Sequence, residues 1–180
     1  PDIRPLVRTV KADWLTLDLD EFGWRGHFDL VFASMSPGVQ DVKTLKKAIA
    51  ASKQYVYLSR FAGPRSQPSL EVVWEHFNQK PYFNQSFDII FPQNWLYAAG
   101  YRPAVHYVSW ERLHRQPVEE AITEIKDMLE MRMDVNREVE KYIGTFIKSN
   151  QDAEGMFSER KGATAGMLLW HTQKKVMRRT

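Results

Sequence analysis

Residues 28–33 read Phe-Asp-Leu-Val-Phe-Ala, an almost continuously apolar run, and a second run, Tyr-Val-Tyr-Leu-Ser, follows at residues 55–59. Short runs of this kind are typical of strands that are buried on both faces of a parallel sheet. Between the two runs, apolar side chains recur at helical spacing over residues 42–49, and Asp41 is suited to the start of that helix. The sequence therefore predicts a strand, a helix and a parallel strand within about 30 residues, joined by a right-handed crossover.

The alternation of strands and helices continues along the chain, which predicts an α/β fold. We expect one domain over residues 1–180, because this length is usual for a single compact domain and no low-complexity linker interrupts it. The other expected strands lie at residues 6–12, 104–110 and 164–171. Apolar stripes predict the other helices near residues 70–77 and 92–99 and in two segments within residues 117–150.

The composition excludes several kinds of site and suggests where the protein works. There is no cysteine, so the chain has no disulfide, no thiolate zinc site and no cysteine nucleophile, which fits a reducing, cytoplasmic compartment. No apolar run reaches the ~18 residues of a membrane span, so we expect no membrane partner. The net charge of +3 owes much to the basic residues within 174–179, which are typical of a solvated tail and do not favour a nucleic-acid partner.

Three segments of this chain resemble the middle of class I S-adenosylmethionine-dependent methyltransferases: residues 10–14 (Val-Lys-Ala-Asp-Trp), residues 28–37 and residues 55–59. Residues 92–108 also resemble sequence found in that family, so the likeness extends from the family's third strand to its last. The resemblance implies a Rossmann-like, doubly wound sheet that is mostly parallel with an antiparallel last strand, in the strand order 3-2-1-4-5-7-6. It also implies S-adenosylmethionine as the cofactor, and it makes the helices within residues 117–150 a helical insertion.

The resemblance assigns roles to residues near the ends of the expected strands. Asp13 would accept a hydrogen bond from the adenine amine, although from its residue type alone it could equally cap a solvated turn. Trp14 would pack against adenine or only anchor its own loop, and the other cofactor-binding residues would be Ala33, Ser34 and Met35. An acceptor pocket would form from the loop at residues 59–68, from residues 95–101 and from the two late helices. Its expected substrate-binding residues are Ser36, Pro37, Ser59, Phe61, Trp95 and Tyr101.

The family's glycine-rich turn is not in this chain. That turn follows the first strand and lets the backbone approach the cofactor, but no two glycines here are separated by a single residue. We therefore expect the first two strands to lie upstream of Pro1, and we expect this chain alone to bind the cofactor weakly and to be inactive. The catalytic residue is unknown. None of the five histidines has metal-ligand spacing, no nucleophile elbow or phosphate loop occurs, and residues 34–37 lack the polar-Pro-Pro-aromatic order of methyltransferases that act on base amines.

Three functions stay open from the sequence. The leading one is methyl transfer to a small-molecule acceptor. The alternatives are a non-catalytic, methyltransferase-like module that binds nucleic acid or protein, and an oxidoreductase on the related dinucleotide fold. Because two central strands would be missing, the strand at residues 6–12 should either pair directly with the strand at 28–34 or leave an edge that recruits a second copy, giving a homodimer.

Overall fold

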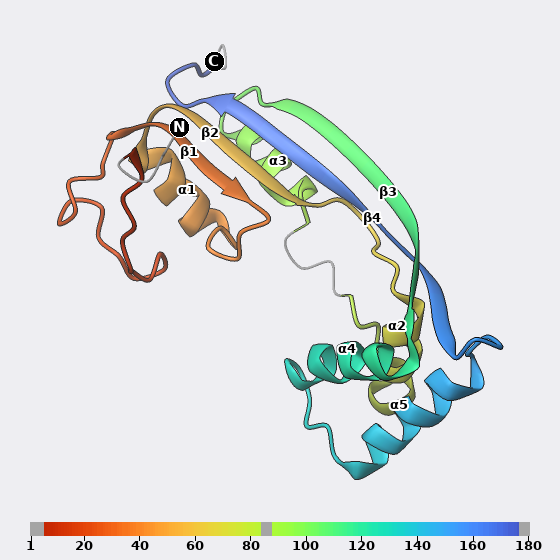
Figure 1. The fold of residues 1–180 in the computed structure, drawn as a ribbon. Helices are drawn as coiled ribbons and strands as arrows, with labels where there is room; N and C mark the ends of the chain where they lie inside the picture. Colours follow the sequence, from red (N-terminus) through yellow and green to blue (C-terminus); the bar gives the residue numbers. More distant parts are fainter. Residues whose placement is uncertain (1–5, 84–87, 177–180) are drawn as a thin grey trace. The chain divides into compact units, whose positions relative to one another are not determined.

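The computed structural model describes residues 6–83 and 88–176 of the chain (Figure 1). Its strands are β1 (Phe28–Ser34), β2 (Ser52–Phe61), β3 (Ala104–Pro117) and β4 (Met156–His171). Its helices are α1 (Val42–Ala51), α2 (Pro68–Asn78), α3 (Ile90–Ala98), α4 (Val118–Glu130) and α5 (Arg137–Ser149). The mixture and order of elements confirm the predicted α/β class, and the strand, helix and strand expected over residues 28–59 are β1, α1 and β2.

The strands form an open sheet in the order β1-β2-β4-β3. β1 and β2 are parallel, and α1 is the crossover between them. β4 runs against β2, because the Thr172 amide donates to the Gln54 carbonyl while the Ala62 amide donates to the Thr164 carbonyl. The structure therefore confirms the predicted Rossmann-like sheet with an antiparallel last strand.

Helix α1 begins where the sequence predicts. The Asp41 carboxylate accepts the Thr44 amide at 2.7 Å, and the Asp41 amide donates to the Thr44 hydroxyl at 3.1 Å. This reciprocal pair satisfies backbone donors that the first turn of any helix leaves free. Leu45 and Ala51 lie on the buried side of the helix, and Ala51 packs in a cluster with Val31 of β1.

The prediction of a strand at residues 6–12 is wrong. The structure shows no strand in this segment, and the Val7 side chain is 62% exposed. A strand needs partners for its backbone groups and a surface on which to bury alternate side chains, and within the described part of the chain this segment pairs with no strand and is exposed throughout. The chain is anchored just after it, where the Lys47 ammonium donates to the carbonyls of Trp14 at 2.8 Å and Leu17 at 2.6 Å. Within the described sheet β1 is consequently an edge strand, and its direct pairing with residues 6–12 does not occur.

The chain divides into two compact units. Unit 1 comprises residues 1–60, 89–106 and 167–180, and unit 2 comprises residues 61–88 and 107–166. The strands β3 and β4 contribute residues to both units. The single domain expected from the chain length stays a prediction.

Helices α2, α4 and α5 share the hydrophobic core of unit 2. Their buried side chains recur every three or four residues, which confirms the apolar stripes predicted within residues 117–150. The buried residues of α4 and α5 are Val118, Ala121, Ile125, Leu129, Val139, Ile143 and Ile147. Across the described part of the chain, no helix combines the length and the apolar character that crossing a membrane requires.

Candidate functional site

Two serines meet at the carboxyl ends of the parallel strands β1 and β2. Ser34 ends β1 and is the register partner of Ser59 on β2. Their hydroxyl oxygens lie 3.0 Å apart, within hydrogen-bond distance, and Ser59 is buried. In open α/β sheets, ligands bind at the carboxyl ends of parallel strands. This serine pair is therefore the centre of the candidate site in unit 1.

The turn that follows β1 holds a strained residue. Met35 has a φ of 49°, in the left-handed region that residues with a side chain rarely adopt. Its amide donates to the Ser59 carbonyl at 3.0 Å and lies 3.2 Å from the Ser59 hydroxyl oxygen, so β2 holds the strained backbone in place. The Met35 side chain remains 41% exposed. Strain of this kind concentrates at ligand sites, where the surrounding structure maintains it.

The next residues continue the turn and bring Trp14 to it. The Ser36 hydroxyl accepts the Gly38 amide at 3.2 Å, and the Arg60 guanidinium donates to the carbonyls of Ser36 and Val39. A Cβ atom added to Gly38 would lie 3.3 Å from the Ser36 hydroxyl and 3.4 Å from the Trp14 ring. Trp14 thus packs against this turn although it is twenty residues away from Ser34 in the sequence. The predicted residues Trp14, Ser34, Met35, Ser36 and Ser59 are brought together here, and Pro37 lies in the same turn.

Asp13 caps a turn rather than ending a strand. Its carboxylate accepts the Leu15 amide at 2.9 Å and the Thr16 hydroxyl at 3.1 Å, and the residue is exposed. The placement at a strand end is therefore wrong, because the strand before it does not form. Asp13 directly precedes Trp14, which packs against the turn after β1, and its contact with adenine stays a prediction.

Trp14 anchors its own loop, as one of the two interpretations of the sequence expected. The ring packs with the buried Leu17 and Leu19. The Lys47 ammonium lies 5.6 Å from the ring centroid, a cation–π distance. The indole N–H is buried and has no hydrogen-bond partner among the described residues. An unpaired donor at this position leaves one polar group that a ligand contact could satisfy.

The remaining predicted site residues have other surroundings. Ala33 is buried within β1. Trp95, on α3, has the Lys46 ammonium 5.7 Å from its ring centroid. Tyr101 is only 4% exposed and has the Lys175 ammonium 4.8 Å from its ring, so it is a core side chain of unit 1. Phe61 belongs to unit 2, where its ring lies 6.3 Å from that of Trp110. None of these contacts of Trp95, Tyr101 and Phe61 involves Ser34 or Ser59.

S-adenosylmethionine, the cofactor that the sequence resemblance implies, fits this donor set in part. The paired hydroxyls and the polarisable thioether of Met35 suit the methionine end of such a ligand. No side chain of the turn from Ser34 to Gly38 is acidic, and the chain has no glycine-x-glycine turn for the rest of the cofactor. Across residues 6–83 and 88–176, no group of three His, Cys, Asp or Glu side chains is placed to hold a metal ion. The residues present therefore suit one end of the cofactor only.

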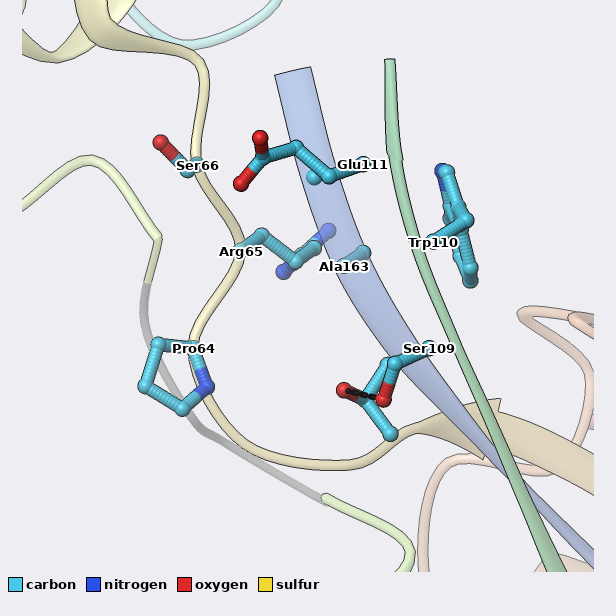
Figure 2. Close-up of a pocket in the computed structure, with 9 residues that line it drawn as sticks. Pro64, Arg65, Ser66, Ser109, Trp110, Glu111 and Ala163 are labelled. Carbon is cyan, nitrogen blue, oxygen red and sulfur yellow. Dashed lines mark hydrogen bonds between the residues drawn. The ribbon is translucent and has the colours of Figure 1, made fainter. Parts of the chain in front are cut away.

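A second candidate site is a pocket of about 380 Å³ in unit 2 (Figure 2). The predicted acceptor loop supplies one wall, and adjacent segments of β3 and β4 supply the others. The loop was recognisable from its glycine and prolines, whereas the strand residues were not, because only strand pairing brings them to the loop. The Ser66 and Gly162 backbones form an antiparallel bridge that fixes the loop on β4. The lining residues are Pro64, Arg65, Ser66, Ser109, Trp110, Glu111, Gly162, Ala163 and Thr164.

Comparisons with known proteins show similarity in three-dimensional structure but no match by sequence. No protein-family model matches the chain, and no curated protein matches it. The chain is similar to a solved structure of a candidate methyltransferase from Bacillus halodurans C-125. The similar region covers 94% of this chain and 79% of the chain in that structure, with 11% sequence identity and a TM-score of 0.50.

Two further solved structures are more distant. One is the MccD protein, which is 13% identical; the similarity covers 89% of this chain and 65% of the MccD chain, with a TM-score of 0.41. The other is phosphoethanolamine N-methyltransferase 2 of Haemonchus contortus, which is 10% identical; the similarity covers 82% of this chain and 34% of that chain, with a TM-score of 0.31. At these identities the likeness concerns the fold alone. The chain thus has a Rossmann-like, methyltransferase-like fold.

Proposed function

We propose that the protein is an S-adenosylmethionine-dependent methyltransferase with a small-molecule acceptor, and that this chain forms its later strands. The observation that carries the proposal is the turn after β1, where a strained Met35 backbone and the paired hydroxyls of Ser34 and Ser59 meet at the carboxyl ends of two parallel strands. The methyltransferase-like fold supports the same assignment.

The chemistry makes modest demands on such a site. Methyl transfer from a sulfonium is a displacement that already has a good leaving group, so the protein has mainly to align the reactants and exclude water. Orientation of this kind contributes about 7–11 kcal/mol to lowering a barrier. In the proposal, the Ser34 and Ser59 hydroxyls and the Met35 backbone position the methionine end of the cofactor, Asp13 accepts the adenine amine, and Trp14 closes the loop beside it. The turn offers no titratable side chain as a general base, so an acceptor that needs one must be activated by a residue elsewhere.

A titration of the 180-residue chain with S-adenosylhomocysteine, followed by two-dimensional NMR, tests the proposal. We expect weak binding, in the millimolar range, with shifts at the amides of Ser34, Met35 and Ser59 and none at Ile143 in α5. Ser59→Ala should weaken this binding about fivefold, because one hydrogen bond to the turn is lost. Ser149→Ala is the matched control, since its hydroxyl contacts only the α5 backbone and a neighbouring side chain.

Two results would overturn the proposal. One is the absence of any shift at residues 33–37 and 59 up to several millimolar ligand. The other is retention of the chain on nucleic acid, sensitive to salt, with the strongest NMR shifts outside this turn, which would favour the non-catalytic module instead.

A further inference from the structure

Among the residues that the structure describes, Arg65 is a cation without a hydrogen-bonded partner. It lies on the loop between β2 and α2 and extends toward β4 across the pocket of unit 2 (Figure 2). Its guanidinium carbon is 4.2 Å from the ring centroid of Phe61 and 4.5 Å from that of Phe83. Among the described residues, the guanidinium donates no hydrogen bond and forms no ion pair. Its planar guanidinium, which carries five N–H donors, therefore packs against two aromatic rings, and none of these donors has an acceptor among the described residues.

The surroundings of Arg65 make this lack of a partner costly. Burial, with a smaller contribution from the like charge of Arg132, lowers the pKa of Arg65 from its usual value. Other arginines of the same unit have acceptors: Arg115 pairs with Asp152 at 2.7 Å, and Arg160 pairs with Glu111 at 3.0 Å. A partly buried charge that lacks an acceptor among the described residues is unfavourable, so an anion that accepts from the guanidinium would stabilise it.

Hydroxyl groups complete the set of donors around the pocket. The hydroxyl oxygens of Ser109 and Thr164 lie 2.8 Å apart (Figure 2), so one hydroxyl donates to the other and one O–H remains free to donate outward. Ser66 adds a third hydroxyl to the lining. Glu111 also lines the pocket, but its negative charge is paired with Arg160. The volume of about 380 Å³ is within the range of small-molecule sites.

We propose that this pocket binds the oxyanion of a small ligand, a phosphate or a carboxylate, through a bidentate contact from Arg65 supported by the Ser109 and Thr164 hydroxyl pair. Guanidinium forks match both kinds of oxyanion geometrically, and such charge-assisted hydrogen bonds are the strong ones. Phe61 and Phe83 hold the guanidinium plane in place, so little conformational freedom is lost on binding. The site is built within unit 2 and does not depend on the proposed methyl transfer.

The test uses the 180-residue chain and two probes, inorganic phosphate and acetate, each titrated at an ionic strength held constant with chloride so that non-specific charge effects cancel. The Arg65 Nε–H signal and the amides of Ser66 and Thr164 report binding by NMR. We expect saturable shifts at these groups with at least one probe, and the tighter probe identifies phosphate or carboxylate as the natural group. Because the wild-type signals report directly, this part of the test requires no variant.

Variants then locate the interaction. Arg65→Met should reduce the affinity for the tighter probe about tenfold or more, and Arg65→Lys, which keeps the charge but loses the fork, should give an intermediate loss. Arg112→Met is the matched control, since Arg112 neighbours Glu111 on β3 but does not line the pocket, and its affinity should equal that of wild type. The proposal fails if neither probe shifts Arg65 saturably, or if Arg65→Lys and Arg112→Met bind equally well.

Discussion

The two compact units carry opposite charge. Unit 1 has fourteen Lys and Arg residues against seven Asp and Glu, whereas unit 2 has eleven against fifteen. The net charge of +3 for the whole chain hides this difference. The candidate sites do not share the net charge of their own units: the side chains of the strand-end turn in unit 1 are uncharged, and the pocket of unit 2 contains an arginine that has no acceptor among the described residues. Local partners rather than total charge therefore decide what each site can bind.

The units also differ in how their polar groups are used. In unit 2, the buried Glu159 accepts the Ser69 amide at 2.9 Å, and its carboxylate lies 3.5 Å from the Lys161 ammonium. Lys161 also pairs with Glu124 at 2.6 Å. In unit 1, Asp41 and Lys47 instead satisfy backbone groups. Unit 2 thus holds a partly buried network of charge pairs on Lys161, in addition to its apolar core.

The largest effects should come from cavities in the two cores. Leu45→Ala in unit 1 and Ile143→Ala in unit 2 each remove a fully buried side chain and should lower the free energy of unfolding by about 2–5 kcal/mol. Urea titrations followed by NMR signals from each unit measure the two transitions separately. If each substitution shifts only its own unit, the units fold independently; if both shift one common transition equally, the single domain expected from the chain length is correct.

Neighbouring residues of β4 allow a sharper test of the charge pairs in unit 2. Lys161→Met leaves the buried Glu159 without its cation and should cost about 3 kcal/mol. Arg160→Met removes an exposed pair with Glu111 and should cost less than about 1 kcal/mol. Denaturation midpoints of the two variants give the comparison. Equal losses would show that the Lys161 pairs contribute no more than surface ones.

Asp41→Ala tests the caps of unit 1. It removes the acceptor for the Thr44 amide and should lower the urea midpoint of unit 1, with no change in unit 2. Asp41→Asn keeps an acceptor at the same position and should recover most of the loss. A larger loss in unit 2 than in unit 1 would contradict the assignment.

The smallest expected effect is a change in acid sensitivity. Burial disfavours the charged form of Glu124, but hydrogen bonds from Lys161 and Gln116 outweigh it and lower the pKa of Glu124 from its usual value of 4.5. A carboxyl group with a depressed pKa stabilises the folded state above its unfolded pKa, and this stabilisation is lost as the pH falls through the folded pKa. The urea midpoint of unit 2 should therefore decrease below about pH 4.5.

Glu124→Gln is the variant for this measurement. It should be less stable than wild type near neutral pH and should show a shallower loss below pH 4.5. An unchanged slope in acid would mean that other carboxyl groups of unit 2 account for the sensitivity.

The sequence alone determined the elements whose signal is local. The apolar run at residues 28–33, the Asp41 cap and the stripes of α4 and α5 were all predicted, because spacing along one segment is enough to define which side is buried. The resemblance to methyltransferases added the part of the strand order that the described sheet has, 4-5-7-6 as β1-β2-β4-β3. It could not show that residues 6–12 form no strand, since a strand exists only when a partner pairs with it.

The tertiary structure decided the sites. Met35 is strained because the register of β1 and β2 holds its amide against Ser59, and no local pattern encodes a φ of 49° for a methionine. Likewise, Arg65 lines one pocket with the Ser109 and Thr164 hydroxyls only because β3 and β4 pair beside the loop. Residues distant in the sequence become one site through strand pairing, which depends on partners that a single segment does not contain.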